Sequence, residues 1–357
     1  MPEAAPLPQA GGITFLSEIR GQPAALRALL EHEGAYARVA AMARERGTKL
    51  IRMVGHGSSD NAASYGVYAF GLIPRWTAMR DSIALTVHYD THLPMAGSTV
   101  IGLSQSGQTP DVIEYVARAR NAGAYTVALT NDLDSDLARE AEDALPLAAG
   151  PEHAIAATKT YLNQVAALAL LAAHAAEEGP RYAKALAVTA ELLDEAIPEL
   201  EQQVRTMALP FASIGRMFVI GRGTEFATAR EIALKLLETC RVAAEPFTAT
   251  ALAHGPVAAL DPLFPVWTVA SHDETLPAVV EAAARVRAAG ATLVASGDAA
   301  DALGDAAYVL RVPQAPSPLL SPLLSVVPGQ LFALALAQAK GLDPDYPAGL
   351  TKVTLAT

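Results

Sequence analysis

The feature that most limits the fold of this chain is an internal repeat with a period of about 166 residues. Gly221 follows an apolar segment and stands 166 positions (221 minus 55) after Gly55, which follows a similar segment. At the same offset, residues 100–103 (Val-Ile-Gly-Leu) fall on residues 266–269 (Val-Trp-Thr-Val). Further matching pairs, one position later, are Gly123 with Gly290 and Val127 with Val294. A register kept through three successive segments indicates gene duplication, which gives two copies of one domain.

Each copy alternates short apolar segments with segments of helical spacing. In the first copy we expect strands over 50–55, 99–103 and 125–129. The helices expected there are 23–43, 61–70 and 111–121, and further helices between 154 and 203 join the two copies. Strands that alternate with helices form βαβ units around a mainly parallel sheet. The sequence therefore predicts an α/β protein, and its 357 residues suit two domains of ordinary size.

The charge balance restricts the kind of ligand that this chain can attract. Its net charge is −11, which argues against a nucleic-acid partner, because affinity for a phosphate backbone comes from clustered Lys and Arg. A phosphorylated ligand would have to be held by local amides, hydroxyls and helix dipoles. The single cysteine, Cys240, excludes a disulfide framework within the chain. We see no signal peptide and no apolar stretch near the ~18 residues of a membrane span, so we expect a cytoplasmic protein with no membrane partner.

The segment 104–109 (Ser-Gln-Ser-Gly-Gln-Thr) is the strongest candidate for a phosphate site. It lies between a predicted buried strand and a predicted helix that starts at Pro110, a favoured first residue of helices. Thr109 is a natural N-cap, and the free N–H groups of the first helical turn favour an anion. The alternative is an ordinary polar turn, but the segment holds more donors than capping requires. The predicted phosphate ligands here are Ser104, Gln105, Ser106 and Thr109.

The second copy has lost this donor-rich loop. Residues 270–275 (Ala-Ser-His-Asp-Glu-Thr) stand in its place. Their two carboxylates would repel a phosphate dianion. We therefore expect one phosphate site in each chain.

A second donor-rich turn, residues 55–59 (Gly-His-Gly-Ser-Ser), follows the first predicted strand of the first copy. Tight packing between a strand and a helix could explain its glycines. Since the turn should lie beside the serine loop, Ser58 and Ser59 are predicted to bind phosphate or sugar hydroxyls.

The second copy carries candidate catalytic residues. Lys235 and Glu238 are three residues apart on a predicted helix, so they are neighbours on one face. A carboxylate can move a proton between C1 and C2 of a sugar while a nearby cation stabilises the developing oxyanion. Spacing alone favours a different interpretation, a surface ion-pair ladder that includes Glu231.

Two further basic residues could take part in the same chemistry. His254, at a bend in an Ala-His-Gly-Pro segment, could be a general acid–base for opening a sugar ring, or a capping histidine. Lys352, near the end of the chain, could meet a substrate carbonyl, or be solvated. No metal motif, phosphate-binding Walker loop or dinucleotide fingerprint is present, so we expect no cofactor.

Taken together, these segments resemble the sugar isomerase (SIS) domain family, including the isomerase half of glutamine–fructose-6-phosphate amidotransferase and SIS-type glucosamine-6-phosphate deaminases. The resemblance covers nearly the whole chain. It rests on the segments 18–23 (Glu-Ile-Arg-Gly-Gln-Pro), 57–59, 104–109, 158–159, 233–238, 254–256 and 349–352. It implies two tandem duplicated SIS domains, each a mainly parallel sheet flanked by helices. The boundaries that we expect are a lead-in over 1–22, a first domain over 23–203, a second over 204–342, and a tail over the site at 343–357.

The resemblance also implies a role for each candidate residue. Ser59 and the serine loop would hold the phosphate. Glu238 would move the proton between C1 and C2 with help from Lys235. His254 would open the sugar ring, often from the partner subunit of a homodimer whose site lies at the subunit interface, and Lys352 would meet the substrate carbonyl.

The chain departs from the family pattern in ways that bear on its substrate. The glutamine-hydrolysing domain is absent, Ala157 stands where the family often has Ser, and Ala251 where it often has Glu. We therefore expect an enzyme that converts glucosamine 6-phosphate to fructose 6-phosphate and ammonia without glutaminase activity. The alternatives are an aldose–ketose isomerase of hexose phosphates and a non-catalytic regulator that binds sugar phosphate.

Overall fold

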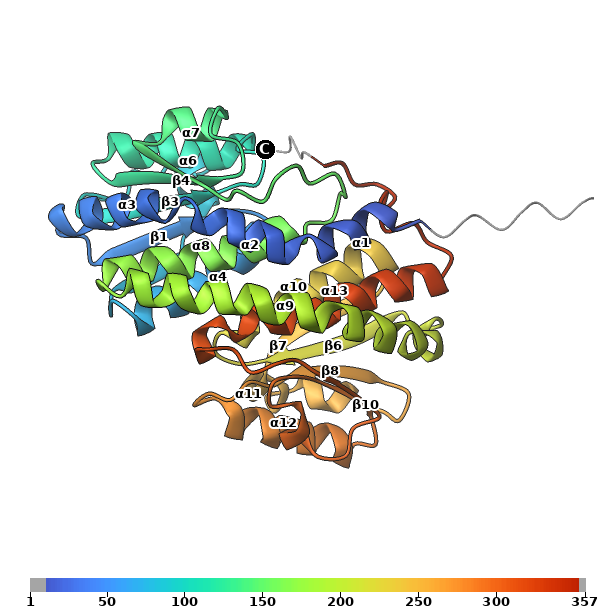
Figure 1. The fold of residues 1–357 in the computed structure, drawn as a ribbon. Helices are drawn as coiled ribbons and strands as arrows, with labels where there is room; N and C mark the ends of the chain where they lie inside the picture. The colour runs from blue at the N-terminus through green and yellow to red at the C-terminus, as the bar shows by residue number, and fades with distance from the viewer. Residues whose placement is uncertain (1–10, 353–357) are drawn as a thin grey trace, which may run out of the picture.

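The computed structural model of the protein describes residues 11–352, which form two parallel five-stranded sheets (Figure 1). The first sheet has the strand order β2-β1-β3-β4-β5. Its strands are β1 (Leu50–Val54), β2 (Thr77–Arg80), β3 (Ser98–Leu103), β4 (Tyr125–Thr130) and β5 (Asp143–Pro146). The two central strands β3 and β4 are buried along their whole length, because helices cover both faces of the sheet.

The second sheet repeats the topology of the first. Its order is β10-β9-β8-β6-β7, and all its neighbouring strands are parallel. Its strands are β6 (Arg216–Gly221), β7 (Ala243–Thr248), β8 (Pro265–Val269), β9 (Thr292–Gly297) and β10 (Tyr308–Arg311). When β6 to β10 are matched in the order of the repeat to β1 to β5, the two sheets have the same connectivity. The predicted duplicated α/β fold is therefore confirmed.

The helices of the first half follow the expected alternation with two differences. They are α1 (Ile13–Arg20), α2 (Gln22–Leu30), α3 (Glu33–Glu45), α4 (Ser58–Leu72), α5 (Ile83–Val87), α6 (Pro110–Asn121), α7 (Asp136–Glu140), α8 (Lys159–Ala175) and α9 (Gly179–Met207). The single helix expected over 23–43 is wrong, since the amides of Glu31 and His32 bond carbonyls three residues back and so end α2. Much of the expected lead-in is the helix α1, which packs on α13 through the buried Phe15 and Ile19.

The second half contributes four α-helices and the four 3₁₀ helices of the described residues. They are η1 (Leu209–Phe211), α10 (Glu225–Cys240), α11 (Ala249–Leu252), η2 (Pro256–Ala259), α12 (Leu276–Ala288), η3 (Ala300–Leu303), η4 (Pro318–Leu320) and α13 (Ser321–Ala339). Helices α4, α8, α9, α10 and α13 lie between the two sheets, and α6, α7, α11 and α12 lie on the outer sides (Figure 1). One continuous apolar core contains residues of both halves, among them Leu168 and Phe332. The contact of α4 with α10 positions the site. It brings α4 of the first copy against the helix of the second copy that carries Lys235 and Glu238.

Helix α13 corrects the sequence analysis in one respect. Together with η4 it makes a run of 22 residues, Pro318–Ala339, with mean hydropathy 1.8, so by length and composition it could cross a membrane. It was missed because Ser, Pro and Gln interrupt the apolar residues. In the folded chain 94% of its most apolar window is buried, so it is the central core helix of the two-domain body.

Candidate functional site

The serine loop connects β3 to α6 and is held in a single conformation by its own hydrogen bonds. Gly107 adopts φ +64°, and a Cβ atom there would overlap Ser135 Oγ, so only glycine fits. The Ser104 hydroxyl accepts from the Gly107 amide at 3.1 Å. It also lies 2.9 Å from the Thr109 hydroxyl. Thr109 is the N-cap residue as predicted, but its side chain does not cap α6, because it bonds across the loop to Ser104.

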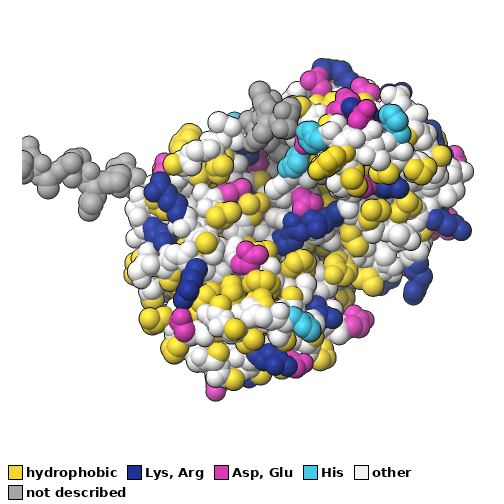
Figure 2. Space-filling model, turned by 180° about the vertical axis from the view of Figure 1, so that it is seen from behind, with side chains coloured by type: hydrophobic (Ala, Val, Ile, Leu, Met, Phe, Trp, Pro, Cys, Tyr) yellow, Lys and Arg dark blue, Asp and Glu magenta, His cyan; other side chains and the backbone are white. Residues whose placement is uncertain are grey.

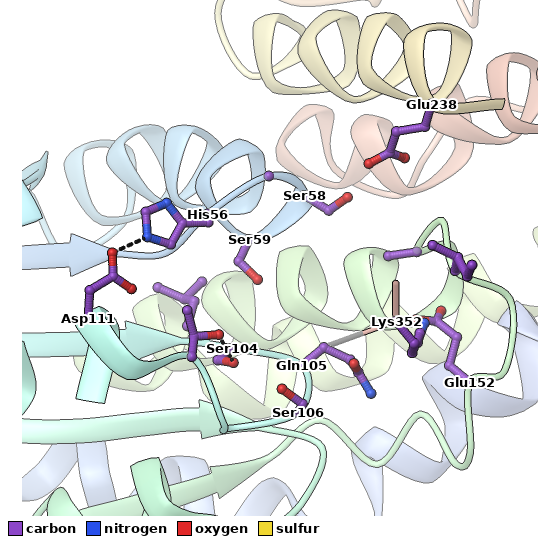
Figure 3. A pocket seen from close by; sticks show the side chains of 15 residues that line it. His56, Ser58, Ser59, Ser104, Gln105, Ser106, Asp111, Glu152, Glu238 and Lys352 are labelled. Atoms are coloured by element: carbon purple, nitrogen blue, oxygen red, sulfur yellow. Dashed lines mark hydrogen bonds and ion pairs between the residues drawn. The ribbon is translucent and has the colours of Figure 1, made fainter. Parts of the chain in front are cut away.

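The turn between β1 and α4 faces the serine loop with one of its two serines. Ser59 Oγ accepts a hydrogen bond from the buried Gln164 at 2.8 Å, which fixes this hydroxyl beside the loop. Ser58 points the other way, toward α10 (Figure 3), where its hydroxyl donates to Glu231 Oε1 at 2.9 Å. The two adjacent serines therefore face the two ends of one site.

These segments enclose a pocket of about 450 Å³ between the two copies. Its lining contains eight of the ten predicted site residues, namely Ser58, Ser59, Ser104, Gln105, Ser106, Thr109, Glu238 and Lys352. Glu238, from α10, lies across the pocket from the serine loop, whereas Lys352, from the tail, lies on the side of Gln105 (Figure 3). The pocket thus has a hydroxyl-rich end and a charged end.

The charged end is organised around Lys235, which is completely buried behind Glu238. Its Nζ lies 2.6 Å from Glu238 Oε2 and 3.3 Å from Glu231 Oε1. Burial by itself lowers the pKa of Lys235, but the two carboxylates outweigh it and hold this pKa above its ordinary value. The surface-ladder interpretation is therefore wrong, because Lys235 is buried, and its raised pKa favours the protonated form.

Lys352 is docked on the rim of the pocket by two hydrogen bonds and is only partly exposed. Its Nζ donates to Glu152 Oε2 at 2.9 Å and to the Ala154 carbonyl at 2.6 Å. Glu152 is completely buried, and it also accepts from the amides of Thr158 and Thr160. Burial raises the pKa of Glu152, but Lys352 and these hydrogen bonds outweigh it, so the pKa lies below its ordinary value.

Helix α1 holds both the tail that carries Lys352 and the loop that receives it. Asp345 caps the start of α1, accepting from the Gly12 amide at 3.0 Å and the Phe15 amide at 2.7 Å. From the same helix, the buried Glu18 accepts from the His153 amide at 2.5 Å and so fixes the loop beside Glu152. The N-terminal helix is therefore part of the site's scaffold, which the sequence did not indicate.

Two predicted residues do not line the pocket. Lys235 lies behind Glu238, as described. His254 is exposed, between α11 and η2, where Gly255 adopts φ +133° and turns the chain. The predicted bend is confirmed, but within one chain His254 is separate from the other candidate residues.

Three pocket residues were missed by sequence reasoning. Glu152 was missed because its partners are up to 200 residues away. His56 and Asp111 also line the pocket, and His56 Nε2 lies 2.7 Å from Asp111 Oδ2. One local feature could have indicated Asp111 as a pocket residue. It follows Pro110 directly in the first turn of α6, next to the serine loop.

The equivalent region of the second copy is filled by a carboxyl group. Glu225 stands 166 positions after Ser59 and is buried in the first turn of α10. The Ser271 hydroxyl, from the loop that replaces the serine loop, donates to Glu225. Burial raises the pKa of Glu225 to about 7. These contacts agree with the expectation that only the first copy binds phosphate.

Charged and potentially metal-ligating side chains elsewhere in the described chain are dispersed (Figure 2). Within residues 11–352, no group of three or more His, Cys, Asp or Glu side chains is arranged to hold a metal ion. On the face shown in Figure 2, basic and acidic side chains are interspersed and form no continuous basic field. Cys240 is buried, and burial raises the pKa of its thiol to about 11.

Comparison with known proteins agrees with this architecture. The family model of the SIS domain matches twice, over residues 46–174 and 211–339. The glutamine–fructose-6-phosphate aminotransferase of Leifsonia xyli is 35% identical over 86% of this chain and 52% of its own length. The chain thus spans about half the length of such relatives.

Two solved structures share the whole fold. A candidate phosphosugar isomerase from Silicibacter pomeroyi is 32% identical, with a TM-score of 0.81 over 93% of this chain and 99% of its own. The C-terminal domain of glucosamine-fructose-6-phosphate aminotransferase from Francisella tularensis is 25% identical, with a TM-score of 0.85 over 95% and 99%. With two matched domains, two duplicated sheets and a serine loop at the carboxyl end of β3, the chain belongs to the SIS domain family.

Proposed function

We propose that this protein is a cytoplasmic enzyme that converts glucosamine 6-phosphate to fructose 6-phosphate and ammonia. The observation that carries the proposal is the pocket that joins the serine loop to Glu238 and Lys352 (Figure 3). One end offers the hydroxyls and helix N-terminus that suit a phosphate, and the other offers a carboxylate next to a buried cation. The names of its relatives, a phosphosugar isomerase and aminotransferases of fructose 6-phosphate, support the same substrate class.

The proposed reaction needs one proton transfer and one hydrolysis. Glu238 takes the proton from C2 of the open-chain sugar and returns it to C1, which leaves an imine at C2. Water then adds to C2, the C–N bond breaks, and ammonia leaves as C2 becomes a ketone. Lys235, held protonated behind Glu238, positions this carboxylate through their ion pair, and Lys352 on the rim stabilises the negative charge that develops on the C1 oxygen.

The thiol within these 357 residues is not suited to glutamine hydrolysis. These 357 residues contain one thiol, that of Cys240, and it is buried, with a raised pKa and a hydrogen bond to the Ala333 carbonyl. A thiol of this kind is a poor nucleophile for glutamine hydrolysis.

We also propose that the active form is a homodimer in which His254 serves the partner's pocket. Apolar side chains with large exposed fractions flank Glu238: Leu237 is 54% exposed, Leu350 42% and Tyr346 73%. They line a groove directly beside Glu238. A second copy seated on this surface would bury them, and its exposed His254 could reach the sugar ring.

The first test is the release of ammonia and fructose 6-phosphate from glucosamine 6-phosphate without glutamine. Equal amounts of both products are expected, and Glu238→Gln should abolish them while the exposed control Glu281→Gln retains them. Interconversion of hexose phosphates without ammonia would instead support the aldose–ketose isomerase. Binding without turnover of any hexose phosphate would support the regulator.

The shared site can be tested by mixing two inactive variants. If His254 acts in the partner's pocket, Glu238→Gln and His254→Asn chains should form mixed dimers that have one intact site. Activity should then return to about a quarter of the wild-type value after subunit exchange. If both residues act within one chain, mixing restores nothing.

A further inference from the structure

We propose that His56 is the counter-cation of Asp111 in the phosphate end of the pocket, and that a phosphate dianion binds there because this pair is intact. The inference rests on the proposed binding of a sugar phosphate and adds a residue pair to that site. His56 is the last residue but one before α4, and Asp111 is in the first turn of α6. The side chains of His56 and Asp111 lie on the same side of the pocket as Ser59 and Ser104 (Figure 3).

The charges of the pocket lining show why such a partner is needed. Three carboxylates line the pocket, and each has one basic partner. Glu152 pairs with Lys352, and Glu238 pairs with Lys235. Asp111 pairs with His56, at 2.7 Å. His56 lies on the side of Ser104 and Lys352 on the side of Gln105 (Figure 3), so His56 is the basic lining residue nearest the Ser104 end of the loop.

The charge of Asp111 depends on a neighbouring basic group more than the charge of an exposed carboxylate does. Its side chain is only 9% exposed, and Oδ1 has no hydrogen-bond partner in the described part of the chain. Water therefore compensates its charge poorly. Without the imidazole on Oδ2, the carboxylate would meet an incoming dianion directly, and like charges at such range repel.

The pair is better explained by ligand binding than by stability. The His56 side chain is 58% exposed, and ion pairs at that exposure contribute little to folding. The net charge of the chain also works against the approach of an anion. A local cation beside the serine hydroxyls counteracts both effects.

The test is a double-mutant cycle read by equilibrium binding of inorganic phosphate, so that it does not depend on turnover. His56→Asn should weaken phosphate binding at least fivefold, because Asn can bond Asp111 but carries no charge. His56→Asn combined with Asp111→Asn should return the affinity to within about threefold of wild type, since the repelling carboxylate is gone. The control is His88→Asn, a change of a histidine in the same half of the chain that does not line the pocket.

The outcomes separate this inference from the proposed function. Phosphate affinity unchanged in His56→Asn, or a double variant as weak as His56→Asn alone, would overturn it. If glucosamine 6-phosphate is not turned over but the cycle behaves as expected, the pair stands and the proposed reaction does not.

Discussion

Lys352 Nζ lies 2.9 Å from Glu152 Oε2, an ion pair between residues 200 positions apart that fixes the end of the described chain on the rim of the pocket. Glu152 is completely buried and Lys352 is 24% exposed, so the pair links the protein interior to the rim of the pocket. The geometry makes Lys352 a positioned cation in the unliganded protein. Its ammonium group therefore has a defined place on the rim of the pocket.

Loss of this cation should impair both turnover and folding. We expect Lys352→Gln to lower kcat at least tenfold and to cost about 3 kcal/mol of unfolding free energy, because the buried Glu152 keeps its amide donors but loses its counter-charge. The matched control is Lys159→Gln, which removes a lysine that bonds the Pro151 carbonyl of the same loop. Steady-state kinetics and thermal melts give the comparison. Equal kcat in the two variants would show that Lys352 has no part in the reaction.

The anchor of the tail on α1 should matter for the same reason. Asp345→Asn removes a negative charge from the N-terminus of α1 and should destabilise the protein by about 1 kcal/mol. Because the tail would then hold Lys352 less firmly, kcat should fall while the affinity for inorganic phosphate stays unchanged. Asp305→Asn, an exposed carboxylate in the second half, is the control. A fall in phosphate affinity, with kcat unchanged, would contradict this role.

The serine loop should not tolerate a side chain at its glycine. Gly107→Ala places a Cβ atom against Ser135 Oγ at a positive φ, which we expect to cost about 1–3 kcal/mol and to weaken phosphate binding. Gly34→Ala is the opposite control, because Gly34 lies in α3 with open space around it, and alanine there should be neutral or stabilising. Melting temperatures and phosphate titrations measure both effects. If the Gly107→Ala variant binds phosphate with wild-type affinity, the serine loop is not the phosphate site.

The buried Glu225 predicts a definite pH dependence of stability. Its pKa rises from 4.5 in the unfolded chain to about 7 in the fold, so the folded state favours the protonated form. The contribution of Glu225 to the free energy of unfolding is therefore complete below about pH 4.5 and is lost as the pH rises through about 7. The free energy of unfolding changes by an amount on the order of 3 kcal/mol over this range. Glu225→Gln should flatten this decline in denaturant unfolding between about pH 5 and pH 8, whereas the exposed Glu281→Gln should not. A decline of equal size in the Glu225→Gln variant would assign it to another group.

The sequence alone determined the architecture and the local chemistry of this protein. The repeat from Gly55 to Gly221 predicted two copies of one α/β domain, because the periodicity of buried strands and helices depends on near neighbours in the chain. The serine loop and the adjacency of Lys235 and Glu238 were predictable for the same reason. One is a strand-to-helix turn, and the other is a helical spacing of three residues.

Only the tertiary structure decided which charges pair and which groups meet. His56 with Asp111, Glu152 with Lys352, and Asp345 with α1 join segments 55 to about 330 residues apart, and no local pattern encodes such pairs. Burial also reversed one interpretation, since Lys235 has the spacing of a surface ion pair but lies in the interior. Local sequence sets the conformation of each element, whereas the packing of α4 on α10 and of the tail on α1 sets the distances between elements. The electrostatics of the site depend on those distances.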